Sequence, residues 1–245
     1  MKETLNDGVF AVPGGLLWLE RSRSVVAADV HFGYEEVIGG ALPLWSTPEC
    51  VATLCNAARE LRAEEIVLLG DVIHGAAMSS GAAELVSGGL RRLRRQARLV
   101  LIAGNHEGKS RGAAVLGETH EEIERQGWIL SHGDRPALRA RVIIGHLHPS
   151  LHLGSNQSAP AFLSAQRLIV VPALTPYSHG LDVRSDACLA ALASWGIACA
   201  DVEVVASSAS RLFRFGSLAS LRSGAASARG SNQGRFRRKF LRPDR

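Results

Sequence analysis

The stretch Ser24-Val25-Val26-Ala27-Ala28-Asp29-Val30-His31 joins a short apolar run to an aspartate and a histidine. The same arrangement returns along the chain, where apolar runs at 66–69, 99–103, 128–130 and 142–144 each lead into a short polar motif. Runs of this length and composition are typical of strands buried in a sheet. In open α/β sheets, functional side chains collect beyond the carboxyl ends of the strands. We therefore expect an α/β fold whose site is built at the strand ends.

Five short motifs of histidine with an acidic or amide residue follow these apolar runs. In chain order they are Asp29-Val30-His31, Asp71-Val72-Ile73-His74, Asn105-His106, His132-Gly133-Asp134 and His146-Leu147-His148. Carboxylate, amide and imidazole groups are ligands for divalent metal ions, and these motifs contain no cysteine. Asp29 and His31 point the same way on an extended backbone, and a carboxylate such as Asp71 can bridge two cations about 3.5–4 Å apart. The motifs therefore predict a two-metal hydrolase site.

The first hundred residues read as the alternating strands and helices of a parallel sheet. Ser46 or Thr47 is expected to cap the first helix, with Pro48 in its first turn. The expected elements are a hairpin at 8–12 and 15–20, a strand at 24–29, a helix to about residue 62, a strand at 65–70, a helix at 82–96 and a strand at 98–103.

Beyond residue 109 the pattern becomes richer in strands. Residues 118–126 fit a short helix or a loop. Strand-like runs follow at 128–131, 142–145, 161–164, 168–171, 189–193 and 197–205. Two β-sheets packed together, with helices outside them, accommodate this order of elements.

Positive charge is concentrated toward the end of the chain. The 245 residues carry a net charge of +5, but ten Lys or Arg stand against one acid from Ala209 onward, which leaves −4 for residues 1–208. We expect residues 1–208 to form one domain and residues 209–245, rich in Ser, Gly, Ala and Arg, to be a basic, disordered tail. Such a tail can attract nucleic acid by counterion release or can keep the protein soluble, and the sequence leaves both roles open.

The expected location and redox state follow from simple sequence features. No stretch reaches ~20 uninterrupted apolar residues, and residues 1–7 lack the apolar core of a secretory signal. We expect a cytoplasmic protein with no membrane partner. The four cysteines form no Cys-x-x-Cys pair, and we expect them to be reduced thiols.

Taken together, the motifs resemble the signature of the calcineurin-like metallophosphoesterase superfamily, over roughly residues 22–185. The resemblance implies a four-layer sandwich of two mixed β-sheets flanked by helices. It also implies that Asp29, His31 and His148 hold a first metal ion, that Asn105, His132 and His146 hold a second, and that Asp71 bridges them. His106 would then be the acid beside the scissile phosphate.

Three stretches resemble more narrowly the small phosphoesterases related to SbcD, a family of nucleases that repair double-strand breaks in DNA. The stretches are residues 31–36, 70–74 and 171–180. In those nucleases a histidine at the place of His74 helps to position the phosphate, so His74 is a second catalytic candidate; its alternative role is to orient a metal ligand. His179 lies in a loop expected to close over the metals and is a candidate for substrate contact. Glu107 follows His106 where the family usually has aspartate.

The resemblance implies a phosphodiesterase, and more narrowly a DNA nuclease, in which a hydroxide bridging two metal ions attacks phosphorus. His106 would protonate the leaving oxygen. Manganese is the ion that the resemblance implies, although iron, zinc or magnesium also suits these ligands. A small phosphomonoester or a nucleotide as substrate, and a non-catalytic scaffold, are the alternatives. The sequence leaves open whether the chain forms a homodimer.

Overall fold

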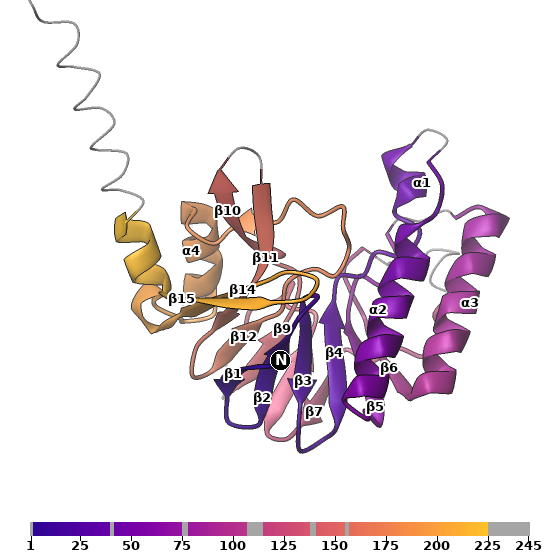
Figure 1. Ribbon diagram of the computed structural model, residues 1–245, viewed down its shortest axis with the longest axis horizontal. Helices are drawn as coiled ribbons and strands as arrows, with labels where there is room; N and C mark the ends of the chain where they lie inside the picture. Colours follow the sequence, from indigo (N-terminus) through magenta and orange to yellow (C-terminus); the bar gives the residue numbers. More distant parts are fainter. Residues whose placement is uncertain are drawn as a thin grey trace, which may run out of the picture.

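The computed structural model describes residues 2–39, 42–74, 78–106, 115–137, 141–154 and 157–224. Two β-sheets pack face to face between two sets of helices (Figure 1). The expected α/β sandwich of two mixed sheets is therefore confirmed.

The first sheet has six strands, which follow one another across the sheet in chain order. They are β1 (Glu3–Asn6), β2 (Val9–Val12), β3 (Leu16–Leu19), β4 (Ser24–Ala28), β5 (Glu65–Leu69) and β6 (Arg98–Ile102). The first four are antiparallel neighbours, as the predicted opening hairpin requires, and β4, β5 and β6 run parallel. The parallel connections run through the long helices α2 (Ser46–Glu60) and α3 (Ser80–Gln96), which pack side by side.

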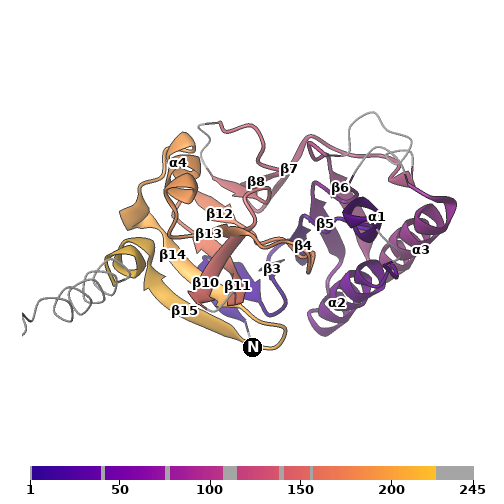
Figure 2. The same ribbon diagram turned by 90° about the horizontal axis from the view of Figure 1, so that it is seen from above.

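The second sheet has nine strands. They are β7 (Glu122–Arg125), β8 (Trp128–Ser131), β9 (Val142–Ile144), β10 (Pro149–Gly154), β11 (Gln157–Ser164), β12 (Leu168–Val170), β13 (Leu181–Asp182), β14 (Glu203–Ser207) and β15 (Leu212–Ser217). Within it β8, β9 and β12 are parallel, whereas the long hairpin of β10 and β11 is antiparallel. The helix α4 (Asp186–Ser194) follows β13 and lies on the outer side of this sheet (Figure 2).

Successive side chains of the central strands face opposite layers, as the period of a strand requires. In β4, Val25 packs toward α2 and α3, whereas Val26 packs against the second sheet. In β5, Ile66 likewise packs toward the helices and Val67 against the second sheet. Because both faces of these strands are covered, the strands read as continuous apolar runs instead of alternating ones.

Several local predictions differ from the structure. Neither Ser46 nor Thr47 caps α2, because the helix begins at Ser46 and the Thr47 hydroxyl accepts a hydrogen bond from Gly33 N at 2.9 Å instead. Part of 118–126 forms the strand β7, in which Ile123 alternates with exposed acids. The run 189–193 belongs to the helix α4, whose N-cap Ser185 accepts a hydrogen bond from Cys188 N at 3.1 Å.

The expected start of the basic tail at residue 209 also needs correction. Residues 212–217 form β15, which pairs antiparallel with β14, and residues 218–224 are helical. Leu218 is fully buried and Leu221 packs against the same core as α4. The folded domain therefore extends to at least residue 224, and the rest of the expected tail, residues 225–245, lies outside the described residues.

All four cysteines are free thiols, as expected. Among the residues that the structure describes, no helix has the length and hydropathy needed to cross a lipid bilayer.

Candidate active site

The central strands of the first sheet end level with one another. Ala28 pairs with Leu69, and Leu69 pairs with Ile102, so β4, β5 and β6 finish at the same edge. The loop after the second-sheet strand β12 crosses to this edge, where Leu174 N donates to Ala28 O at 2.9 Å. The polar residues that follow these strands are thus brought to one place.

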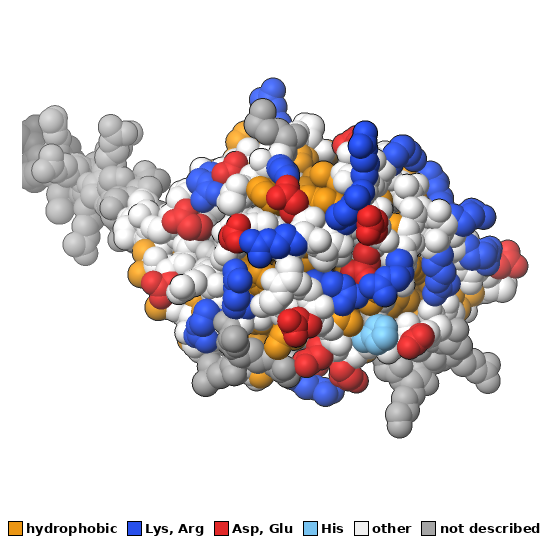
Figure 3. Space-filling view, turned by 90° about the horizontal axis from the view of Figure 1, so that it is seen from below, with side chains coloured by type: hydrophobic (Ala, Val, Ile, Leu, Met, Phe, Trp, Pro, Cys, Tyr) orange, Lys and Arg blue, Asp and Glu red, His pale blue; other side chains and the backbone are white. Residues whose placement is uncertain are grey.

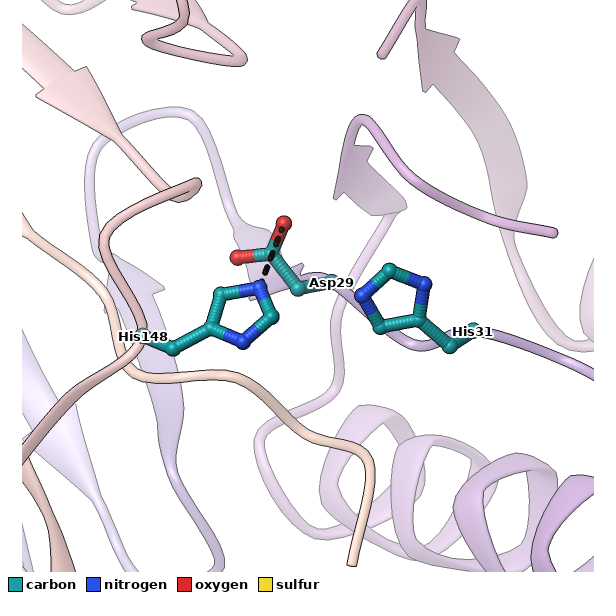
Figure 4. Close-up of side chains that lie close together, drawn as sticks. All are labelled: Asp29, His31 and His148. Atoms are coloured by element: carbon teal, nitrogen blue, oxygen red, sulfur yellow. Dashed lines mark ion pairs between the residues drawn. The ribbon is translucent and has the colours of Figure 1, made fainter. Parts of the chain in front are cut away.

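One group of side chains consists of Asp29, His31 and His148. One ligand atom of each lies within 4.8 Å of the others. His148 Nε2 is 3.4 Å from Asp29 Oδ1, and the two imidazoles lie on either side of the carboxylate (Figure 4). Asp29 is fully buried and His31 nearly so.

A second group contains Asp29, Asp71 and His132, again with ligand atoms within 4.8 Å of one another. His132 Nε2 lies 3.5 Å from Asp71 Oδ2, and its Nδ1 lies 3.7 Å from Asp29 Oδ1. Asn105 Oδ1 and His146 Nδ1 lie 2.8 and 3.1 Å from the same His132 Nε2. The structure therefore brings together all seven residues expected to hold metal, and Asp29 belongs to both groups.

The backbone at these residues is unusual. Asp29, His31, Asp71, His146 and His148 all have positive φ, between 43° and 63°. Side-chain-bearing residues rarely adopt this left-handed conformation, and such strain is found mainly where a functional site requires it.

Two neighbouring glycines leave room for the acidic side chains. A Cβ on Gly104 would overlap Asp71, and a Cβ on Gly145 would lie 2.7 Å from Asp29 Oδ2. The absence of a side chain at these positions therefore lets strands from both sheets approach the carboxylates closely.

His106 and His74 lie together beside the two groups. Their rings stack with centroids 4.3 Å apart, and His74 Nδ1 is 3.2 Å from His31 Nδ1. The His106 backbone N–H donates to Asp71 Oδ1 at 3.0 Å, while 44% of the His106 side chain remains exposed. His106 is thus tied to a carboxylate of the second group and still open to a molecule from solution.

His179, expected to contact the substrate, belongs to neither ligand group and is exposed, so its role stays a prediction. The preceding residue, Ser178, contacts one of the expected metal ligands, since its Oγ lies 2.7 Å from His148 Nδ1. Sequence reasoning missed Ser178. Its place in the loop 172–180 was the available signal, but a serine alone does not show which neighbour it bonds. Glu107 lies outside the described residues.

Burial and neighbouring charges change the basicity of the imidazoles. Burial lowers the pKa of His31 to about 3, more than the charge of Asp29 raises it. Burial also lowers the pKa of His146 and of His74. Burial acts in the same direction on His148, but its interaction with the nearby Asp29 carboxylate raises the pKa above its ordinary value.

The donor set fits divalent metal ions. Asp29 Oδ1 is buried and accepts no hydrogen bond, although two imidazole nitrogens face it. A buried oxygen left in this state costs stability unless a cation or proton compensates it. Neutral imidazoles, which burial favours at His31 and His146, are the form that binds metal.

An α/β sandwich with aspartate, asparagine and histidine ligands at its strand ends is the architecture of a metal-dependent hydrolase. The family profile described as calcineurin-like phosphoesterase matches residues 22–163. The chain belongs to this family and is a hydrolase of phosphoester bonds.

The solved structure of a nuclease shares this fold. The nuclease MPE of Pseudomonas putida is 20% identical, with a TM-score of 0.68, and the match covers 88% of this chain and 99% of that one. The E. coli phosphoesterase Yfce is 18% identical with a TM-score of 0.38, over 65% of this chain and 81% of its own. No curated protein sequence matches the chain at a significant level.

Proposed function

We propose that this protein is a phosphodiesterase that cleaves nucleic acid with two divalent metal ions, as a DNA nuclease related to the SbcD family. The observation that carries the proposal is the pair of ligand groups that share Asp29, with the open ring of His106 beside them. The narrower resemblance to SbcD-related proteins and the structural similarity to a nuclease support nucleic acid as the substrate. Manganese is the metal that we propose, and DNA repair in the cytoplasm is the setting.

Seven residues would hold the ions. Asp29, His31 and His148 would bind the first, Asn105, His132 and His146 the second, and Asp71 would bridge them. When bound, two divalent ions neutralise phosphate oxygens and lower the pKa of a water molecule that attacks phosphorus. Because Asp29 lies in both groups, its carboxylate is placed to influence both ions.

The remaining residues would position and protonate the substrate. His106 is placed to donate a proton to the leaving oxygen, since its ring is exposed and its backbone is fixed by Asp71. His74 would contact the phosphate or hold His31 in position, with its ring against both His31 and His106. Ser178 would orient His148 through Nδ1 and so direct Nε2 toward Asp29.

The charge distribution bears on how a phosphate is neutralised. On the face opposite the site, seen from below in Figure 3, Lys and Arg side chains lie interspersed with Asp and Glu. Arg23, Arg141 and Arg167 each precede a parallel strand, and Arg98 begins another, so they lie at the amino ends of the strands. Arginine, paired with acids such as Glu65, therefore lies at the amino edge of the sheets, while the site histidines with Asp29 and Asp71 lie at the carboxyl edge. Bound metal ions would supply positive charge at the scissile phosphate.

A substrate panel with manganese tests the proposal. It compares single-stranded DNA, duplex DNA, RNA, a cyclic nucleotide, bis-p-nitrophenyl phosphate and phosphomonoesters, alongside metal analysis of the purified protein. We expect bound metal, manganese-stimulated cleavage of diesters and preference for nucleic acid. Equal or faster hydrolysis of phosphomonoesters would point to a small-molecule phosphatase. No metal and no hydrolysis would point to a non-catalytic scaffold.

A further inference from the structure

An aromatic strip extends from the candidate active site to solvent. The Tyr34 ring packs edge-on against His74, with centroids 4.8 Å apart. Tyr177 continues the strip at 5.8 Å from Tyr34, and Trp45 follows at 5.6 Å from Tyr177. Tyr34, Tyr177 and Trp45, here called the aromatic strip, come from two loops far apart in the sequence.

The outer end of the aromatic strip is more exposed than a packing cluster requires. Trp45 is 45% exposed, whereas the other three tryptophans of the chain are buried, at 5% or less. Exposed large apolar side chains gather in the same segment, where Val37, Ile38 and Leu42 are 46%, 49% and 45% exposed. Exposed apolar side chains next to a functional site are typical of a binding surface.

Buried contacts hold the segment that presents these rings. Glu35 is 1% exposed and accepts a hydrogen bond from Ser46 N at 2.7 Å, next to Trp45. Glu36 accepts one from Ser79 N at 2.9 Å, at the start of α3. Both acids therefore brace the segment that carries Tyr34 and Trp45.

The chemistry of the aromatic strip indicates its ligand. Nucleobases stack on exposed aromatic rings in proteins that bind single-stranded nucleic acid, with little dependence on sequence. The rings begin beside His31 and His74, so a base attached next to a phosphate at the metal ligands lies within their reach. A phosphomonoester without an aromatic group would leave the aromatic strip unused.

We infer that Tyr34, Tyr177 and Trp45 form a base-stacking subsite that selects single-stranded nucleic acid. The inference rests on the proposed phosphodiesterase function and adds the part of the substrate that is recognised. Trp45 is the outer stacking residue, Tyr177 the central one, and Tyr34 joins them to the histidines.

The first test is kinetic and uses the full chain with manganese. The substrates are a short single-stranded oligonucleotide and an abasic oligonucleotide with the same backbone. We expect Trp45→Ala or Tyr177→Ala to raise KM for the base-bearing strand by about tenfold, and to leave KM for the abasic strand unchanged. Tyr177→Phe keeps the ring and should retain the wild-type KM. Phe213→Ala, which removes an exposed ring on β15, is the matched control.

The second test measures binding without hydrolysis. In EDTA, stacking of a base on Trp45 should quench the fluorescence of this exposed tryptophan, and the abasic strand should not. Trp45→Phe should abolish the quenching while circular dichroism confirms the fold. Equal KM for the two strands, with no base-dependent quenching, would overturn the subsite and leave the diesterase function standing. If neither strand is hydrolysed, the proposed function fails, and the quenching measurement still decides whether bases bind.

Discussion

Gly145 shows at the scale of one residue how closely the two sheets approach each other at the site. A Cβ at this position would lie 2.6 Å from Ala28 Cβ and 2.7 Å from Asp29 Oδ2. We therefore expect Gly145→Ala to push Asp29 away and to cost about 1–3 kcal/mol of unfolding free energy. Manganese affinity should fall by about 10- to 100-fold, which is the usual loss when a residue that orients a metal ligand is replaced. Urea unfolding and calorimetric titration with manganese measure the two effects.

Gly88→Ala is the matched control for this substitution. Gly88 lies inside α3, and its added Cβ would make only an ordinary contact, 3.8 Å from Arg91 Nη2. Alanine in a helix interior is favoured over glycine by about 0.5–1 kcal/mol, so this variant should be slightly more stable and bind manganese normally. Wild-type manganese affinity in Gly145→Ala would show that Asp29 is not positioned through this contact.

His106 allows the proton-transfer role to be separated from metal binding. Its ring is not part of either ligand group, and its backbone N–H makes the bond to Asp71 that any residue there can make. We expect His106→Ala to lower kcat for a diester by about 10²–10⁴-fold while the metal content stays at the wild-type level. Steady-state kinetics and metal analysis on the same preparation test this. Unchanged turnover with metal bound would remove His106 from the proposed mechanism.

At the scale of elements, periodic patterns and ordinary turn signals predicted much of the first sheet. Its parallel strands are short apolar runs, and α3 begins near its predicted start because Ser79 caps it through Ala82 N. The helix α4 was missed because a short apolar run fits a buried strand and a buried helix equally well. The five motifs were found because they follow strands. The aromatic strip was not, because its rings meet only when the loops of the two sheets come together.

Glu65 organises an ion-pair cluster at the amino ends of the parallel strands, away from the site. Its buried carboxylate accepts hydrogen bonds from Arg125 Nε at 2.8 Å and Nη2 at 2.9 Å, from Ser24 Oγ at 2.9 Å, and from Arg98. Burial alone raises the pKa of Glu65, but the hydrogen bonds from Arg125 and Ser24 and the two arginine charges outweigh it. The pKa is therefore lowered from its ordinary value of 4.5.

A lowered pKa predicts how stability depends on pH. Since the folded protein holds Glu65 ionised, its contribution is present above about pH 4.5 and is lost as the pH falls through the folded-state pKa. Glu65→Gln should therefore cost about 1.5–3 kcal/mol near neutral pH, and the difference from wild type should shrink in acid. Urea unfolding of both proteins across this range measures it. Glu64→Gln is the control, because the Glu64 side chain is 68% exposed and its carboxylate forms an ion pair with Arg23. A constant difference between Glu65→Gln and wild type at every pH would contradict the prediction.

At the scale of the whole molecule, β15 completes the second sheet. It pairs with β14 along its length, and Arg214 reaches Glu3 at 2.8 Å, so the late strand also contacts the first strand of the other sheet. The next turn buries Leu218 against the core beneath α4. Residues beyond 208 therefore consist of two parts that composition alone did not distinguish. The first part completes the folded domain, and the second is strongly basic in sequence.

Two truncations separate these parts. A chain ending at residue 208 loses β15 and Leu218 and should unfold at clearly lower urea concentration, since an edge of β14 and an apolar core are uncovered. A chain ending at residue 224 keeps both and should match the full chain in stability.

The chain that ends at residue 224 lacks seven Lys or Arg and one acid of the full chain. If those cations contact phosphates, the full chain should bind single-stranded DNA with a steeper loss of affinity in salt, by about 0.7 in log–log slope for each contact. Fluorescence anisotropy over a salt series measures the slope. Equal slopes for the two stable chains would mean that residues 225–245 do not bind nucleic acid, while cleavage at the metal ligands would remain to be explained by the folded domain alone.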